Sequence, residues 1–327
     1  MLRVLETKST DVYYNQALEK ILFDQAKKGE VILYLWRNDN AVVIGKNQDL
    51  FAEINVPAFK ATSGKAARRI SGGGAVYHDL DNLNFTFIAH NSLYDVGRQL
   101  YVITTALKSL GIHAAVTGRN DMEINGRKFS GSAFYRSGNF SLHHGTLMLR
   151  CSETKMERFL TPDKMKLTLK GISSVRSRVG SISDEKEVSL EELTAAIRTA
   201  FASVYGEEVS ELGEKKFFET AKQRAREFSD EDWVKRGGKS FETVVKTHFF
   251  WGGFTLKYNR EGNRIKEAQI DTDALETDIF PRIERALFAA PATCGGIYET
   301  LKTISPQSHA EENIVSDLMS FFYEEEA

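Results

Sequence analysis

Apolar positions recur along the chain with two different spacings. Short apolar or alternating runs, typical of strands, are separated by segments in which apolar residues recur every three or four positions, as in amphipathic helices. The runs that predict strands are 2–5, 31–36, 41–44, 66–70, 83–89, 112–116, 122–124 and 140–149. Helices are predicted at 11–28, 95–110, 153–160, 190–204 and 214–227.

Polar residues mark where several of these elements begin. Asp95 can cap the second long helix, and Ser189 with Glu192 three residues later has the pattern of a capping box. Asn125-Gly126 is the strongest short hairpin signal in the chain. We therefore expect Lys128 at the start of a strand that returns from a tight turn.

The last quarter of the chain has its own set of elements. Composition changes near 237–239, and two β runs follow at 248–258 and 264–270. Helices are predicted near 276–288, 296–303 and 310–323. This pattern predicts a large domain over residues 1–240 and a small one over residues 246–327.

Composition and charge narrow the class of protein. The 327 residues are 42% hydrophobic and 27% charged, with a formal net charge of −2, which argues against non-specific binding of nucleic acid. Two cysteines are too few for a disulfide framework and favour a reducing cytosol. No apolar run reaches the length of a membrane span, so we expect a cytoplasmic protein without a membrane segment.

A run of three glycines gives the first chemical signal. In Arg68-Arg69-Ile70-Ser71-Gly72-Gly73-Gly74, a turn without Cβ atoms lets a ligand approach the main chain, and its free N–H groups can form a concave anion site. The two arginines add forked donors for carboxylate or phosphate. Taken alone, such a run is more often a plain tight turn carrying two solvated arginines.

Lys128 gives the second signal. The small residues 131–133 follow it, which are expected to interrupt this strand and to leave room for a ligand, and Asn120 and Asp121 lie close in sequence. Asp121 can hold Mg²⁺ as a hard oxygen ligand, and Lys128 can neutralise a carboxylate and a phosphate that repel each other. Formation of an acyl adenylate requires that neutralisation. The polar segment 162–183 is interpreted as a mobile loop over such a site.

Other familiar motifs are missing from the sequence. It has no GxxxxGK[ST] stretch, no GxGxxG after a strand, no HExxH and no paired CxxC. His143 and His144 are neighbours on a predicted strand, so they point to opposite faces and cannot share a metal. One is expected to face a cavity and the other solvent or a loop, although a structural role suits each histidine taken alone.

Taken as a set, these stretches resemble the lipoate–protein ligase A family of the biotin/lipoate protein ligase superfamily. The resemblance runs nearly the whole length, with the motifs in the family's order. It rests on the glycine run with Ala75-Val76-Tyr77-His78-Asp79, on Asn82 to Phe87, on Gly118-Arg119-Asn120-Asp121, on Lys128 to Ala133, on His143 to Leu147, on Lys170 to Val179, and on Phe250-Trp251-Gly252-Gly253.

The resemblance implies a fold and a reaction. The fold is α/β (α+β), a mixed-sheet catalytic domain like that of biotin ligases with a small C-terminal α/β accessory domain. The reaction is ATP-dependent and uses Mg²⁺: lipoate becomes lipoyl-AMP, and the lipoyl group passes to a lysine of a lipoyl domain on an E2 subunit or of glycine-cleavage H protein. A cytoplasmic monomer that binds neither nucleic acid nor membrane is expected.

The resemblance also implies roles for individual residues. Lys128 matches the family's essential lysine, Asp121 the metal region, and 164–179 the loop that closes over the adenylate. Nucleotide-binding positions are Arg69, Gly74, Ala75, Val76, Tyr77, Asn120, Asp121, Lys128, Lys170 and Val179. Lipoate-binding positions are Arg69, Ser71, Gly72, Gly73, Lys128, Ser130 and His144.

Several alternatives stay open at this stage. A transferase could take a lipoyl or octanoyl group from a carrier or a preformed adenylate, and a non-catalytic lipoate-binding protein would share the pocket. A biotin ligase is disfavoured because the Gly-Arg-Gly-Arg signature is absent. The sequence leaves undecided whether octanoate replaces lipoate, which acceptor is used, how the domains are oriented and whether the chain oligomerises.

Overall fold

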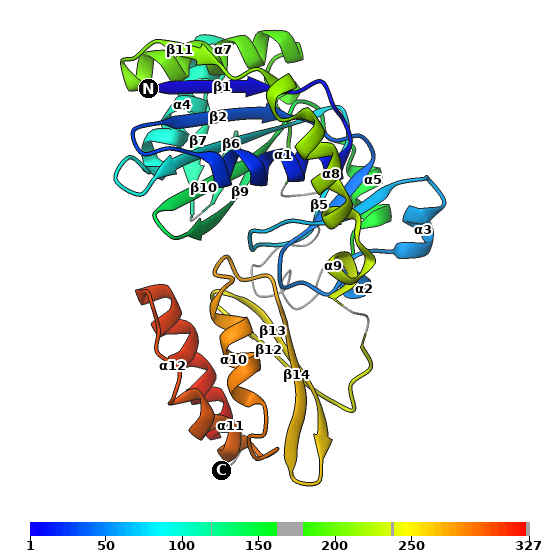
Figure 1. Ribbon diagram of the computed structural model, residues 1–327. Helices are drawn as coiled ribbons and strands as arrows, with labels where there is room; N and C mark the ends of the chain where they lie inside the picture. Colours follow the sequence, from blue (N-terminus) through cyan, green and yellow to red (C-terminus); the bar gives the residue numbers. More distant parts are fainter. Residues whose placement is uncertain (119, 162–178, 237–238, 325–327) are drawn as a thin grey trace.

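An eight-stranded sheet, a three-stranded C-terminal sheet and a small layer of three short strands organise the described residues (Figure 1). The computed structural model describes residues 1–118, 120–161, 179–236 and 239–324. The largest sheet has the strand order β11-β1-β2-β6-β10-β9-β8-β7, with parallel pairing of β1 to β2 and β11 and antiparallel pairing from β2 to β7. It is mixed, as the resemblance implied.

The strands of this sheet are β1 (Leu2–Glu6), β2 (Val31–Trp36), β6 (Asn82–His90), β7 (Ala115–Thr117), β8 (Asp121–Ile124), β9 (Arg127–Ser137), β10 (Phe140–Met148) and β11 (Val209–Glu211). A small layer with the order β4-β3-β5 contains β3 (Ala41–Ile44), β4 (Lys65–Arg68) and β5 (Val76–His78). The C-terminal sheet contains β12 (Thr243–Phe249), β13 (Gly252–Glu261) and β14 (Arg264–Thr272).

Helices cover both faces of the large sheet. On one face α4 (Val96–Ser109) and α7 (Leu190–Tyr205) enclose a core that includes Phe87 and Phe201. On the other face α1 (Val12–Gln25) and α8 (Phe218–Ser229) pack over Tyr34 and Ile88. Shorter helices are α2 (Leu50–Glu53), α3 (Val56–Lys60), α5 (Glu153–Phe159) and α9 (Glu231–Lys235).

Several predicted boundaries are confirmed with their physical cause. The Asp95 carboxylate accepts from the N–H of Arg98 at the start of α4, and Ser189 and Glu192 form the expected reciprocal capping box. At the hairpin between β8 and β9, Asn125 and Gly126 have φ of 52° and 75°. Positive φ at both positions is what a two-residue hairpin turn requires.

Two strand predictions are wrong. The run 248–258 is divided, because β12 ends at Phe249, β13 begins at Gly252, and these two residues face each other across a tight turn. Gly252 has φ of 152°, and a Cβ there would lie 2.7 Å from Oδ1 of Asp273, so only glycine fits this turn. Conversely, the small residues 131–133 do not interrupt a strand, since β9 continues through them.

The C-terminal sheet carries three helices, α10 (Ile279–Leu287), α11 (Cys294–Leu301) and α12 (His309–Glu324), on one face. The end of this sheet at which β14 finishes contacts the glycine turn of the N-terminal part. The N–H of Gly73 donates to the carbonyl of Ala274 at 3.0 Å, and the N–H of Thr272 donates to that of Asn47 at 2.8 Å. The segment after β14 therefore lies directly on the turn.

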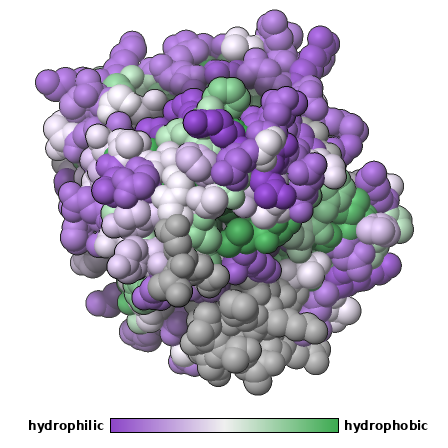
Figure 2. Space-filling view, turned by 90° about the horizontal axis from the view of Figure 1, so that it is seen from below, coloured by the Kyte–Doolittle hydropathy of each residue, from purple (hydrophilic) through white to green (hydrophobic). Residues whose placement is uncertain are grey.

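The surface is mostly hydrophilic when the molecule is seen from below, with apolar side chains gathered in a few patches (Figure 2). Within the described ranges, none of the helices is both long enough and apolar enough to cross a bilayer.

Arg68 fastens the turn region to its surroundings. Its side chain is fully buried and donates to five main-chain carbonyls at 2.7 to 3.0 Å. These belong to Gly45, Lys46, Gln48, Trp233 and Val234. Burial and the nearby Arg236 lower the pKa of Arg68 to about 9. Its donors are used by the protein's own backbone, so Arg68 does not offer the free forked donors to an anion that the sequence suggested.

Replacing Arg68 with methionine should destabilise the protein strongly. Five main-chain carbonyls would each lose a donor, which we expect to lower the free energy of unfolding by about 3 kcal/mol. The urea midpoint of the purified variant measures this. The matched variant Arg260→Met, on an exposed position of β13, should unfold near the wild-type midpoint. Equal midpoints for both variants would contradict the fastening role of Arg68.

Candidate active site

Lys128 and Asp121 form an ion pair across two neighbouring strands. The ammonium Nζ lies 2.6 Å from Oδ1 of Asp121, on β8. Asp121 is paired in register with Gly131, and a Cβ at Gly131 would lie only 3.0 Å from Nζ and 3.1 Å from Cε of Lys128. The end of the lysine side chain therefore lies in close contact with the strand position of Gly131.

A β-bulge sets the direction of Lys128. Glu123 pairs with Lys128 and Met122 pairs with Ser130, so Phe129 is one extra residue in β9. Phe129 is fully buried in the core beneath α4 and α7. A bulge re-aims the side chains on either side of it, and here it allows Lys128 to share the face of Gly131.

The chain returns to the lysine after the segment that the sequence assigned to adenylate binding. Val179 forms a parallel bridge with Lys128, and the N–H of Gly180 donates to the carbonyl of Lys128 at 2.9 Å. Val179 is buried beside the ion pair. Lys170 and the rest of 164–178 lie outside the described residues.

Arg69 shapes the glycine turn from inside. Its guanidinium donates to the carbonyls of Gly72 and Gly74 at 2.5 and 2.8 Å, to that of Val43 at 3.1 Å and to Oγ of Ser71 at 3.1 Å. Burial lowers its pKa to about 10, so the group stays charged near neutral pH. A Cβ at Gly73 would lie 3.9 Å from that of Ala133, which places the turn over β9 close to Lys128.

His144 links the glycine turn to a buried carboxylate. Its Nε2 lies 2.6 Å from Oγ of Ser71, and its Nδ1 lies 2.8 Å from Oε1 of Glu19 on α1. Thr86 donates to the same Glu19 oxygen at 2.6 Å and accepts from the indole N–H of Trp36. The chain of contacts orients both the imidazole and the serine hydroxyl.

Sequence reasoning missed Glu19. The available signal was a carboxylate within the buried side of α1, where Leu18, Ile21 and Leu22 form the core. A buried carboxyl group needs hydrogen-bond partners, and Glu19 finds them in His144 and Thr86. His78 was also missed, although it lies in the quoted motif. It is buried, and its Nδ1 accepts from Nδ2 of Asn38 at 3.0 Å.

The two adjacent histidines do face opposite sides of the sheet. His143 points toward α4, where its Nδ1 lies 2.9 Å from Oε1 of Gln99. Burial lowers the pKa of His143 to about 3. Both rings are buried, so the expectation that one of them faces solvent or a loop is wrong.

The remaining predicted positions differ in how close they lie to Lys128. Asn120 borders the ion pair, since its amide donates to the carbonyl of Ser132 at 2.9 Å. Ala75, Val76 and Tyr77 lead from the glycine turn into β5 and are half-buried. Ser130 pairs with Met122, a member of the core beneath α4 and α7, so it is not brought to the Lys128 side.

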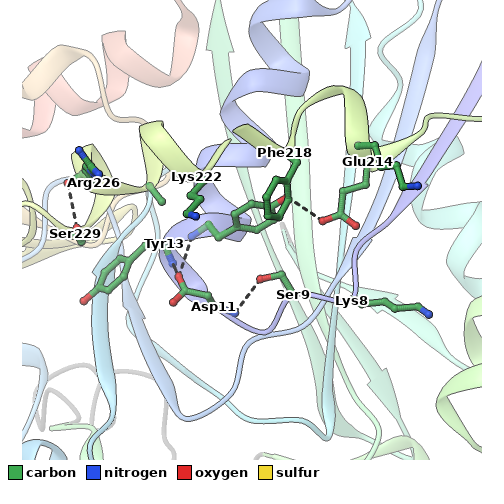
Figure 3. Close-up of a pocket in the computed structure, with 12 residues that line it drawn as sticks. Lys8, Ser9, Asp11, Tyr13, Glu214, Phe218, Lys222, Arg226 and Ser229 are labelled. Carbon is green, nitrogen blue, oxygen red and sulfur yellow. Dashed lines mark hydrogen bonds between the residues drawn. The ribbon is translucent and has the colours of Figure 1, made fainter. Parts of the chain in front are cut away.

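A separate groove lies between the start of α1 and α8 (Figure 3). Its volume is about 690 Å³. It is lined by Lys8, Ser9, Asp11, Tyr13, Tyr14, Glu214, Lys215, Phe218, Lys222, Ala225, Arg226 and Ser229. None of the predicted site residues within the described ranges lines it, so the chemistry is assigned to the Lys128 region and not to the groove.

Comparisons with known proteins identify the family of the chain. A family model described as the lipoyl protein ligase A/B catalytic domain matches residues 11–202, and one described as the bacterial lipoate protein ligase C-terminus matches residues 239–322. Lipoate-protein ligase A of Psychrobacter cryohalolentis is 36% identical over 296 residues, covering 88% of this chain and 87% of the relative. The chain therefore belongs to the lipoate–protein ligase A family and is an enzyme of the ligase class.

Solved structures show the same fold. LipL1 of P. falciparum, determined in complex with lipoate, superposes with a TM-score of 0.84 at 26% identity and covers 98% of both chains. A bi-partite lipoate protein ligase of Thermoplasma acidophilum, described with its E2 lipoyl domain, gives a TM-score of 0.61 at 26% identity over 74% of this chain and 98% of its own. The biotin/lipoate ligase-like architecture expected from the sequence is confirmed.

Gly131→Ala should weaken the ligase reaction without unfolding the protein. The added Cβ would lie 3.0 Å from the Lys128 ammonium and displace it by a few tenths of an ångström; since a misplacement of about 1 Å can cost about a hundredfold in rate, we expect a loss of about tenfold. Pyrophosphate release with lipoate and Mg-ATP measures it. Gly213→Ala is the control, because a Cβ there meets nothing within 4 Å. Wild-type rates for both variants would show that the glycine at 131 is not required.

Proposed function

We propose that this chain activates lipoate with ATP to give lipoyl-AMP and transfers the lipoyl group to the ε-amine of a lysine on a lipoyl domain. The observation that carries the proposal is the placement of Lys128: its ammonium lies over Gly131, beside Asp121 and close to the buried glycine turn. Residues 1–240 would form the catalytic domain and residues 246–327 the accessory domain.

In the first step a carboxylate oxygen of lipoate attacks the α-phosphorus of ATP, and pyrophosphate leaves. The two reacting groups are both anionic, so a fixed ammonium between them lowers the repulsion most where charge accumulates in the transition state. Lys128 is suited to this role because a main-chain ladder and the Asp121 carboxylate hold it in place. Ser71, Gly72 and Gly73 would lie along the acyl chain.

The donor set suits Mg²⁺ held through the nucleotide. Among the described residues, no group of three or more histidine, cysteine or acidic side chains gathers as a metal cage. Mg²⁺ commonly takes one or two carboxylates together with substrate phosphates and water. Asp121 would supply the carboxylate, and the bound ion would neutralise charge on the phosphates.

In the second step the acceptor amine attacks the acyl carbon of the mixed anhydride. The amide bond forms, the bond to phosphate breaks, AMP leaves and the amine loses a proton. Val179, buried beside Lys128, would help to shield the adenylate from water, since a water-excluded site protects a reactive anhydride. A monomer acting in the cytoplasm on E2 lipoyl domains or glycine-cleavage H protein completes the proposal.

Lys128→Ala should abolish lipoyl-AMP formation while the fold persists. The side chain is partly exposed and its removal deletes one ion pair, so the urea midpoint should move little. Pyrophosphate release with lipoate and Mg-ATP should fall by at least about a thousandfold, in line with loss of a central electrostatic group. Lys108→Ala, on the exposed end of α4, should keep the wild-type rate.

Two outcomes would change the assignment. Full adenylation by Lys128→Ala would remove this lysine from the mechanism. No pyrophosphate release by the wild type, but transfer from supplied lipoyl-AMP to a lipoyl domain, would make the chain a lipoyl transferase that depends on activation elsewhere.

A further inference from the structure

Two buried polar side chains next to the Glu19–His144–Ser71 contacts lack partners. Gln16 is 2% exposed and His78 is 3% exposed. Within the described part of the chain, neither amide atom of Gln16 nor Nε2 of His78 finds a hydrogen-bond partner. Buried polar groups are almost always paired, and leaving one unpaired costs about 1–3 kcal/mol. These groups are therefore placed to meet atoms from outside the chain.

The hydrogen-bond network fixes what His78 offers. Oδ1 of Asn38 accepts from the Asn15 amide, so Nδ2 of Asn38 donates to Nδ1 of His78. Burial and the charge of Arg69 lower the pKa of His78 to about 3, so its ring is neutral. A neutral imidazole that accepts at Nδ1 carries its proton on Nε2. The unpartnered atom is thus a donor.

Gln16 lies on the same side of α1 as the site. It precedes Glu19 by three residues and follows Val12 by four, spacings that share one helix face. Val12 packs with Val43 and Ala67, and Glu19 contacts His144. Gln16 therefore lies between the small β3–β5 layer and the imidazole of His144.

His78 belongs to the same region. Its ring centroid is 6.5 Å from that of Trp36, whose indole donates to Thr86, and the charges of Arg69 and His144 both act on it. Glu19 is hydrogen-bonded to both Thr86 and His144, so the surroundings of His78 and those of His144 form one region.

The distance from this region to Lys128 is about the length of an acyl chain. Ala133 on β9, two residues beyond Gly131, pairs with His144 on β10, which pairs with Thr86 on β6. Two strand spacings are roughly 10 Å. A chain with its carboxylate at Lys128 that crosses these strands under the glycine turn would bring its tail to Gln16 and His78.

We propose that Gln16 and His78 make this ligase selective for an acyl tail that carries hydrogen-bond-accepting sulfur, so that lipoate is preferred over octanoate. The proposal rests on the proposed function and names the tail that its acyl site takes. Sulfur is a weak acceptor for N–H donors, whereas the methyl end of octanoate accepts nothing and leaves the amide and the imidazole unpaired. Sites built to hydrogen-bond a substrate reject analogues that lack the partner atom.

The experiment compares the two acids in pyrophosphate release with Mg-ATP. For the wild type, kcat/KM for lipoate should exceed that for octanoate by about tenfold or more, because octanoate leaves the donors unpaired. Gln16→Met keeps the length of the side chain and removes no hydrogen bond within the described residues. It should bring the two kcat/KM values within about threefold of each other, chiefly by improving octanoate.

Gln25→Met, at the exposed end of the same helix, is the matched control and should keep the wild-type ratio. A wild type that uses both acids equally well, or a Gln16→Met variant with an unchanged ratio, would overturn the selectivity role. A structural role alone predicts that unchanged ratio, with at most a shifted urea midpoint. Failure of the wild type with both acids would instead refute the proposed function.

Discussion

The site depends on a guanidinium that is buried inside the glycine turn. Arg69 donates to the carbonyls of Gly72 and Gly74, so the turn is folded around a positive charge that never reaches solvent. The adjacent Arg68 donates in the same way to main-chain carbonyls outside the turn, those of Gly45 and Val234. Together they fix where Ser71 stands, and through Ser71 the contacts to His144 and Glu19.

Local signals were strong where one residue type suits one geometry. The Asn125-Gly126 turn, the Asp95 cap and the capping box at Ser189 each follow from the backbone needs of a single position, so the sequence was enough to predict them. The motifs around Lys128 and the glycine turn likewise predicted the neighbourhood of the site and the family.

The residues that sequence reasoning missed act across long separations. Glu19 contacts His144 only because α1 packs on the face of β10. No residue near either one in the sequence indicates that contact. Arg68 and Arg69 looked like free donors because their acceptors are main-chain carbonyls, which have no sequence signature. The divided strand at Phe249 depends on a neighbouring loop at Asp273 that only the folded structure supplies.

The bulge at Phe129 has a consequence for how this strand can change over time. Side chains alternate along a strand, so one residue more or fewer moves every later position to the other face unless a bulge absorbs the change. Deleting Phe129 would straighten β9 and leave Lys128 paired with Glu123 on the face of Asp121, but the core beneath α4 and α7 would lose a buried phenylalanine. Point substitutions can accumulate along β9 and the bulge can absorb the loss of one residue, whereas a further change of length would move Lys128 to the other face.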